Sequence, residues 1–433
     1  MNCELLKRAI LVIMLILIAA SFGCAALLED DRLVESHHVT APFERPPEEQ
    51  IEVSNFLELK DAIIDLIMEH ETGGRIIVSN YESEEVQADV NRAGYEIITY
   101  HPLGVFAVSE IVGQVTRIVT YFEIDITIEY KRTKQQIDSV IEVASERQLR
   151  TELLSIMSDY RDEALFRTTL QISEEDITKY ISEAYYQNPR MIVMLPIVAV
   201  DIFPDTGEDR IFELSFGLFE QARISHNRIE ILSLYVESNV EHAYGDTDAG
   251  IMLSIAENLI AFANFDEGTA NLISEHGAQN WAATASGALV NASAIGEGFA
   301  MAFKALCDEL MMDCRVILGF LEGRYHAWNI VSLEGEFYHI DVAMADVHGI
   351  ENSFLRTDAD FMERYTWDIE NTVKCNGTLT YQDIVGTEEP DDPDDPDTVE
   401  ETLEYPGEET TEEPGQSGEE PEDTPGQSDE IVT

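Results

Sequence analysis

Basic residues are scarce in this sequence. The 433 residues include 26 lysines and arginines against 85 aspartates and glutamates, a formal net charge of −59. A chain of this kind lacks the basic patch that nucleic-acid binding requires, and its charge does not attract it to anionic lipid. We therefore expect no nucleic-acid partner, and we interpret most of the carboxylates as a strongly solvated surface.

Cysteine is also rare, with five in the chain. Cys3 lies in the N-terminal segment and Cys24 follows its apolar run, which leaves Cys307, Cys314 and Cys375. An odd number does not complete a disulfide framework, and we expect Cys307 and Cys314 to be buried thiols. The sequence indicates no cofactor.

The N-terminus carries an export pattern. Lys7 and Arg8 precede an apolar run, which is followed by small residues and Cys24. This order predicts a secretion signal over residues 1–23. The segment "SFGC" resembles a bacterial lipobox, so we expect lipidation of Cys24 and anchoring on the outer face of the cytoplasmic membrane. An uncut membrane-spanning helix over residues 9–28 and ordinary cleavage with release remain as alternatives.

Two segments have the composition of unfolded chain. Residues 24–52 contain "APFERPPEEQ" and predict a tether. Residues 387–433 hold 20 acidic residues, no basic ones and seven of the 14 prolines. Such a tail cannot bury enough apolar surface to fold, so we predict a disordered acidic tail.

Residues 53–235 read as an α/β region with an internal repeat. "RIIVSN", "SEEVQADVNRAGYEII" and "YFEIDITIEY" have counterparts in "RTTLQI", "SEEDITKYISEAYYQ" and "DRIFELSFGLF". Each copy predicts a strand, a helix with a serine N-cap at Ser83 or Ser173, and further strands. No chemical motif is found in this region.

Residues 245–386 contain the side chains that are candidates for a functional site. "GEGFAMAFKALCDEL" predicts a helix over 296–310, and "HAWNIV" and "EFYHIDV" predict two strands joined near Glu334 and Gly335. If these two residues form the turn, Leu333 pairs with Glu336. His326, Trp328, His339 and Asp341 then share one face, and the Cβ atoms of His326 and Asp341 are about 7 Å apart.

A histidine beside a carboxylate is the arrangement that orients a general base. The carboxylate accepts one imidazole N–H and stabilises the protonated ring. A thiol at the N-terminus of a packed helix would complete a site for acyl transfer through a thioester.

The order "GEGFAMAFKALCDELMMDCRVILGFLEG…HAWNIVSLEGEFYHIDV" resembles the bacterial transglutaminase-like domain of the papain-like cysteine superfamily. The resemblance covers roughly 250–375 and implies an α+β domain in which a helix packs on an antiparallel sheet. The whole chain is similar to exported lipoproteins of Gram-positive bacteria. The resemblance assigns His326 as general base and Asp341 as its orienting residue, with Trp328, Glu297 and Tyr325 along the cleft.

The resemblance places the nucleophilic cysteine at position 296, where this chain has glycine. Cys307 lies 11 residues further along, about 16 Å down the helix axis, too far to replace it. We expect Gly296 to leave a small void where free N–H groups could hold a carboxylate, a carbonyl or water.

These features predict a membrane-anchored extracellular protein with a catalytically inactive transglutaminase-like domain, which binds a peptide, a cell-wall-derived ligand or a protein partner. A residual acyl-transfer or amide-hydrolysing enzyme that uses His326 and Asp341 with water or Ser293 is one alternative. A structural spacer is another. A metal site formed by His326, His339, Asp341, Asp346 and His348 is not predicted, because their spacing matches no zinc motif.

Overall fold

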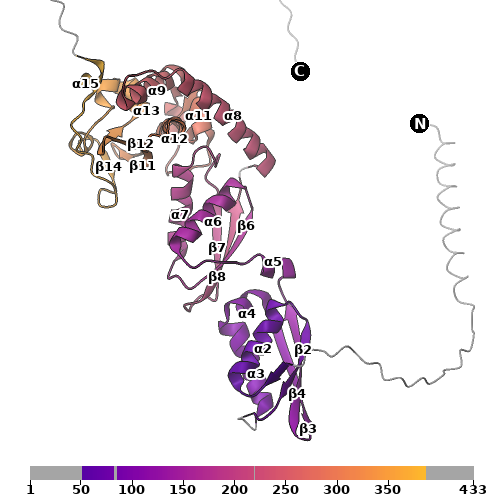
Figure 1. The fold of residues 1–433 in the computed structure, drawn as a ribbon. Helices are drawn as coiled ribbons and strands as arrows, with labels where there is room; N and C mark the ends of the chain where they lie inside the picture. The colour runs from indigo at the N-terminus through magenta and orange to yellow at the C-terminus, as the bar shows by residue number, and fades with distance from the viewer. Residues whose placement is uncertain (1–50, 82–84, 219, 387–433) are drawn as a thin grey trace, which may run out of the picture. The chain divides into compact units, whose positions relative to one another are not determined.

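The computed structural model of the chain describes residues 51–81, 85–218 and 220–386 (Figure 1). The predicted signal peptide, the Cys24 anchor, most of the tether, the acidic tail and the Ser83 cap lie outside the described residues. The predicted α+β class is confirmed, because helices accompany sheets in which most strand pairs are antiparallel. None of the described helices is both long and apolar enough to cross a membrane.

The described residues divide into two compact units. The first comprises the described part of Met1–Leu149 together with Asp162–Glu174 and Val198–Phe216. The second comprises Arg150–Arg161, Glu175–Ile197 and the described residues from Gly217 onward.

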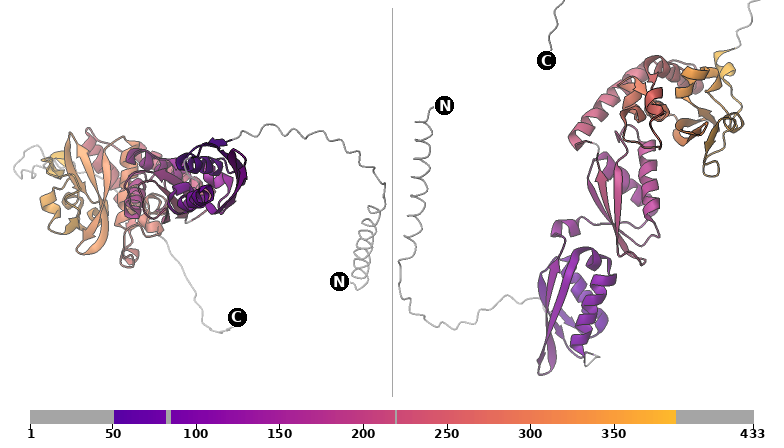
Figure 2. Two further views of the ribbon diagram at one scale, coloured as in Figure 1. Left: turned by 90° about the horizontal axis from the view of Figure 1, so that it is seen from below. Right: turned by 180° about the vertical axis from the view of Figure 1, so that it is seen from behind.

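The first unit begins with a four-stranded sheet of order β1-β2-β4-β3. Strands β1 and β2 are parallel, and the remaining neighbours are antiparallel. Helices α2 and α3 lie on one face of this sheet (Figure 2). The elements are β1 Ile51–Val53, α2 Phe56–Met68, β2 Gly73–Val78, α3 Val86–Tyr100, α4 Pro102–Ala107, β3 Val108–Ile118, β4 Tyr121–Tyr130 and α5 Lys134–Asp138.

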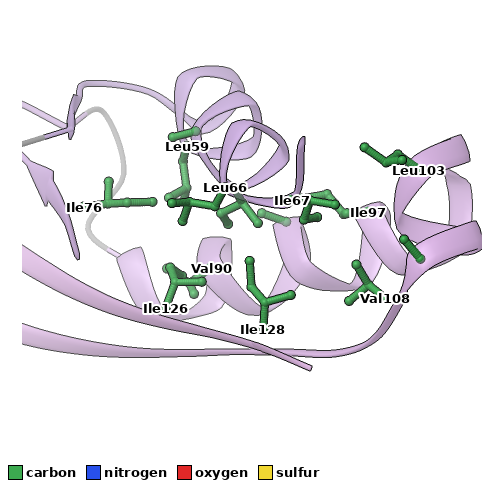
Figure 3. Close-up of a cluster of buried hydrophobic side chains, with 14 of the residues drawn as sticks. Leu59, Leu66, Ile67, Ile76, Val90, Ile97, Leu103, Val108, Ile126 and Ile128 are labelled. Atoms are coloured by element: carbon green, nitrogen blue, oxygen red, sulfur yellow. The ribbon is translucent and has the colours of Figure 1, made fainter. Parts of the chain in front are cut away.

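The apolar spacing of these segments explains their packing. The Asn55 side chain accepts a hydrogen bond from the N–H of Glu58 and so starts α2. Helix α2 then buries apolar residues at helical spacing, while β4 buries alternate residues. Figure 3 shows them meeting in one core, with Leu59, Leu66, Ile67, Ile76, Val90, Ile97, Leu103, Val108, Ile126 and Ile128.

A second four-stranded sheet has the order β5-β6-β8-β7, which repeats the order of the first. Both begin with a parallel pair followed by an antiparallel one. Helix α3 begins at Val86 and helix α7 begins directly after Ser173. The elements are β5 Ile141–Glu142, α6 Glu146–Ser158, β6 Glu163–Thr168, α7 Glu174–Gln187, β7 Ile197–Phe203 and β8 Arg210–Gly217.

The second unit contains a further four-stranded sheet, of order β13-β12-β11-β14, in which every pair is antiparallel. Its strands are β11 Cys314–Leu321, β12 Arg324–Leu333, β13 Glu336–Ile340 and β14 Tyr365–Trp367. The other elements are α8 Ala222–Glu241, α9 Asp248–Phe262, β9 Asn264–Phe265, α10 Glu267–Ala270, η2 Trp281–Ala283, α11 Ala285–Leu289, β10 Ser293–Ala294, α12 Gly296–Glu309, α13 Val342–His348, η3 Ile350–Asn352, α14 Asp358–Phe361 and α15 Tyr381–Val385.

Helix α12 is deeply buried in this unit, and all its residues from Gly296 to Cys307 are buried. The Asn329 amide of β12 donates to the carbonyl of Ala300, 3.0 Å away, and so fixes the helix against the sheet. Gly298 permits close packing on η2, since a Cβ there would lie 2.2 Å from the carbonyl oxygen of Ala282. Cys307, Cys314 and Cys375 are buried free thiols.

Candidate functional site

The β12–β13 hairpin has the predicted register. Leu333 pairs with Glu336, and the ladder continues to Asn329 opposite Ile340. The turn residues Glu334 and Gly335 have φ values of 52° and 86°, the left-handed conformation that a two-residue hairpin turn requires at both positions. The register prediction is therefore confirmed, and Asp341 follows the last residue of β13.

The hairpin brings His326 and Asp341 together. His326 Nε2 lies 2.7 Å from Asp341 Oδ2, and both side chains are buried. Asp341 is also the N-cap of α13, because its Oδ1 accepts the N–H of Met344 at 3.1 Å. The Tyr365 hydroxyl of β14 donates to Asp341 Oδ2 over 2.8 Å. One carboxylate thus orients the imidazole and caps a helix.

These contacts define the protonation of the imidazole. The Met344 N–H and the Tyr365 O–H both donate to Asp341, and the remaining contact is the His326 Nε2 hydrogen bond. We therefore assign the His326 proton to Nε2, which leaves Nδ1 as the basic nitrogen. Nδ1 has no hydrogen-bond partner among the described residues.

The imidazole fills the space beside Gly296. A Cβ at residue 296 would lie 2.3 Å from Cε1 and 2.4 Å from Nδ1 of His326. The ring therefore packs against the glycine Cα and takes the place of a side chain at residue 296, so the open space lies beside this contact and not at it. The basic nitrogen faces the position at which the transglutaminase-like pattern has its nucleophile.

Glu297 is the second residue of α12 and is held in a buried polar cluster. Its Oε1 accepts hydrogen bonds from the Tyr186 hydroxyl at 2.8 Å and from the N–H of Gly277 at 3.2 Å. His276 Nδ1 lies 3.8 Å from Oε2. Burial, together with the negative charge of Glu297, raises the pKa of Tyr186 well above its ordinary value.

A cavity of about 300 Å³ opens beside Gly296 and His326. Glu297 and the 42% exposed Tyr325 also line it. The wall combines apolar residues, charges of both signs and imidazoles: Phe265, Glu267, Ala270, Ile273, Glu275, His276, Ile295, Leu321, Glu322, Arg324, Met344, Val347, His348 and Arg364. Ser293 is not among the lining residues and has no hydrogen bond to His326.

Trp328 lies behind the imidazole rather than along the cavity, where we expected it. It is 1% exposed, and its indole N–H donates to His339 Nδ1 over 2.9 Å. Its ring packs with Phe361, Tyr365 and Trp367. The indole lies in this aromatic cluster because its buried N–H needs an acceptor, which His339 provides there.

His339 and Asp358 form a second pair, with 2.9 Å between Nε2 and Oδ1. Their ligand atoms and the Cys375 sulfur all lie within 4.8 Å of one another, a spacing that could hold a metal ion. His339 Nδ1, however, accepts the indole proton of Trp328, so the imidazole proton is on Nε2 and points toward Asp358. Nε2 therefore has no lone pair free for a metal. The three side chains Trp328, His339 and Asp358 form a hydrogen-bond chain that stabilises the fold.

Three contributors to this region were missed by the sequence analysis: Tyr365, Tyr186 and His276. Tyr365 approaches Asp341 because β14 pairs with β11, opposite Leu321. Tyr186 lies on α7, and this tyrosine is 111 residues from Glu297 in sequence. No local spacing signals either contact.

Comparison with known proteins gives only remote resemblances. No family model and no curated protein matches the sequence. A transglutaminase crystal structure resembles 50% of this chain at 10% identity and a TM-score of 0.25, and the chain covers 60% of that structure's length. A candidate cysteine protease from Cytophaga hutchinsonii resembles 41% of this chain at 12% identity and a TM-score of 0.22, with 70% of its own length covered. Since both scores are below 0.5, we base the functional proposal on the contacts around His326.

We predict that Gly296→Ala destabilises the protein by about 1–3 kcal/mol, because its methyl group overlaps the His326 ring. In the His326→Ala background the same change should cost much less, with a coupling energy of about 1–2 kcal/mol. Urea unfolding of the four proteins measures this cycle. Gly268→Ala is the control, since its Cβ would meet only Asp266 Oδ1 at 3.4 Å. Additive costs would refute the steric contact.

A second prediction concerns pH. Burial lowers the pKa of His339 from its ordinary value of 6.5, an effect that outweighs the opposing hydrogen bond to Asp358. At this site the folded protein therefore binds fewer protons than the unfolded chain. The contribution of neutral His339 to stability is complete above about pH 6.5 and should be lost as the pH falls below that value. Urea unfolding at pH 7 and pH 5 should show a larger loss for wild type than for His339→Gln. Equal losses would count against this role of His339.

Proposed function

We propose that residues 245–386 form a transglutaminase-like domain of the papain-like superfamily that has lost its nucleophile and retains its cleft as a ligand-binding site. The observation that carries this proposal is the packing of His326 on Gly296. An imidazole and the carboxylate that orients it support this proposal, and the ring nitrogen without a partner among the described residues faces a residue without a side chain.

The absence of a nucleophilic side chain at residue 296 determines which reactions the site can catalyse. Acyl transfer through a covalent intermediate requires a sulfur or oxygen nucleophile beside the base. Ser293 does not line the cavity, and Cys307 is buried within α12 with a pKa raised well above its ordinary value by burial. Neither residue can act as a nucleophile at His326 from these positions.

The cavity supports binding of a peptide or a cell-wall-derived fragment. Its volume of about 300 Å³ is at the lower end of the range for small-ligand sites. Apolar side chains and a few polar groups share its wall, which suits a ligand with an apolar body and hydrogen-bonding groups. Ile295 offers no side-chain cap to α12, so the first N–H groups of the helix remain available beside the cavity.

A hydrolase that uses water is the second candidate, because Nδ1 of His326 has no hydrogen-bond partner among the described residues and faces the cavity side of Gly296. In that reaction the imidazole takes a proton from water, the hydroxide adds to an amide carbonyl, and the amine leaves with a proton from the imidazolium. A spacer role, in which the pair is retained for packing alone, is the remaining alternative.

An activity assay with glutamine-containing peptides and muropeptides separates these candidates. We expect no turnover by wild type. Gly296→Cys should yield turnover on the order of 100-fold above the uncatalysed background, a small part of what a triad nucleophile supplies, because its side chain must first displace the imidazole. Gly296→Cys/His326→Ala should be inactive, and Gly296→Cys/Cys307→Ser should remain active.

Two outcomes would contradict the proposal. Wild-type turnover that is lost in His326→Ala would establish the water route. Isothermal titration of wild type that detects no binding of any of these compounds would leave only the spacer role.

We further propose that the protein is exported and anchored through a lipid on Cys24. The support is the sequence order of basic residues, an apolar run and the segment "SFGC". Cells expressing Cys24→Ala should incorporate no radiolabelled lipid into the protein and should release it into the medium. Unchanged membrane retention of Cys24→Ala would instead favour an uncut N-terminal helix.

A further inference from the structure

A second cavity of the 217–386 segment shares no lining residue with the cavity at Gly296. It has a volume of about 1270 Å³ and lies between the loop before α9, the β12–β13 turn and α15. We call it the hairpin groove. Its lining residues are Tyr244, Gly245, Asp246, Thr247, Asp248, Ala249, Gly250, Leu253, Ser254, Glu257, Leu333, Glu334, Glu336, Tyr338, Thr378, Leu379, Asp383, Ile384 and Val385.

The charges of the hairpin groove have one sign. Six carboxylates line it, and its described lining includes no lysine, arginine or histidine. The cavity at Gly296, in the same acidic chain, includes two arginines and three histidines. The absence of cations from the groove is therefore not imposed by the composition alone.

Most of these carboxylates are available to a ligand. Glu336 accepts from the Tyr338 hydroxyl at 2.7 Å, and Asp383 accepts from Thr380 in the capping box at the start of α15. The other four have no ion pair or hydrogen bond with any described residue: Asp246, Asp248, Glu257 and Glu334. Like charges gathered without cations repel one another, and a bound cationic group would relieve that repulsion.

The charges are too dispersed for a single metal ion. Among the described residues, the group with three ligand atoms within 4.8 Å of one another is His339, Asp358 and Cys375, and it includes none of the groove carboxylates. A ligand that matches the groove must therefore spread its positive charge over a distance, as a segment with several lysines or arginines does.

Apolar side chains lie between the carboxylates. Leu253, Leu333 and Tyr338 are buried at the base, whereas Tyr244 and Val385 are 69% and 50% exposed at the rim. The chain's own continuation does not suit this surface, since residues 387–433 contain 20 acidic residues and no basic ones. The volume exceeds that of ordinary small-molecule sites and is large enough for a peptide segment.

We propose that the hairpin groove binds a cationic amphipathic peptide segment of a partner protein. The carboxylates pair with its lysines and arginines, while Tyr244, Leu253 and Val385 contact its apolar side chains. This site is independent of the proposed function of the cavity at Gly296.

Fluorescence anisotropy of the full chain with a labelled peptide of alternating lysine and leucine tests the proposal. The groove variant is Asp246→Asn/Asp248→Asn/Glu257→Gln/Glu334→Gln. Its matched control is Glu230→Gln/Glu237→Gln/Glu363→Gln/Glu370→Gln, which changes the net charge equally at exposed carboxylates outside the groove. We expect about tenfold weaker binding by the groove variant than by the control, from the loss of four carboxylates that pair with the cations of the peptide.

Two further probes test the chemistry of the ligand. A peptide with glutamate in place of lysine should not bind, and one with serine in place of leucine should bind more weakly than the parent. Equal affinity of the groove variant and its control, or of the leucine and serine peptides, would overturn the proposal by reducing binding to general attraction between opposite charges. Stoichiometric Ca²⁺ binding that is lost only in the groove variant would overturn it in favour of a cation site.

Discussion

The contact between the His326 ring and Gly296 is the constraint on which the rest of this site depends. The imidazole approaches the α12 backbone so closely because residue 296 has no side chain. Asp341 holds the far side of the ring, and Trp328 supports it from behind with nearly parallel planes, 18° apart. A ring packed in this way occupies the reaction space of an acyl-transfer site, which explains why we assign binding rather than covalent chemistry to the cavity next to it.

The β12–β13 hairpin of the second unit borders two cavities that differ in charge. Beside Gly296, arginines, imidazoles, carboxylates and apolar side chains are mixed in a small cavity. Across the hairpin groove only carboxylates and apolar or neutral polar groups meet. The hairpin contributes to both, since His326 lies near the start of β12 and Glu334 at its turn. One rigid hairpin can therefore present a mixed site and an anionic site without any change in its own fold.

Local patterns predicted the parts of the site that depend on local geometry. Strand alternation and a Glu-Gly turn were sufficient to place His326 near Asp341, because a two-residue turn fixes the register of both strands. The same reasoning could not find Tyr365 or Tyr186, whose contacts depend on distant elements. It also misplaced Trp328, since strand alternation gives the face of a side chain but not the acceptor that its indole reaches. The free space expected at Gly296 differs in its position: the His326 ring occupies the place of a side chain at residue 296, and the open cavity lies beside the ring.

Asp341 has a consequence for recognising enzymes from sequence. This carboxylate caps α13 and accepts the Tyr365 hydroxyl in addition to holding His326. Its loss would leave a buried hydroxyl and a helix end without their acceptor, a penalty that any descendant protein would incur whether or not it catalysed a reaction. Folding alone can therefore keep a buried histidine–aspartate pair in place. The pair by itself does not show that a protein with this arrangement is an enzyme.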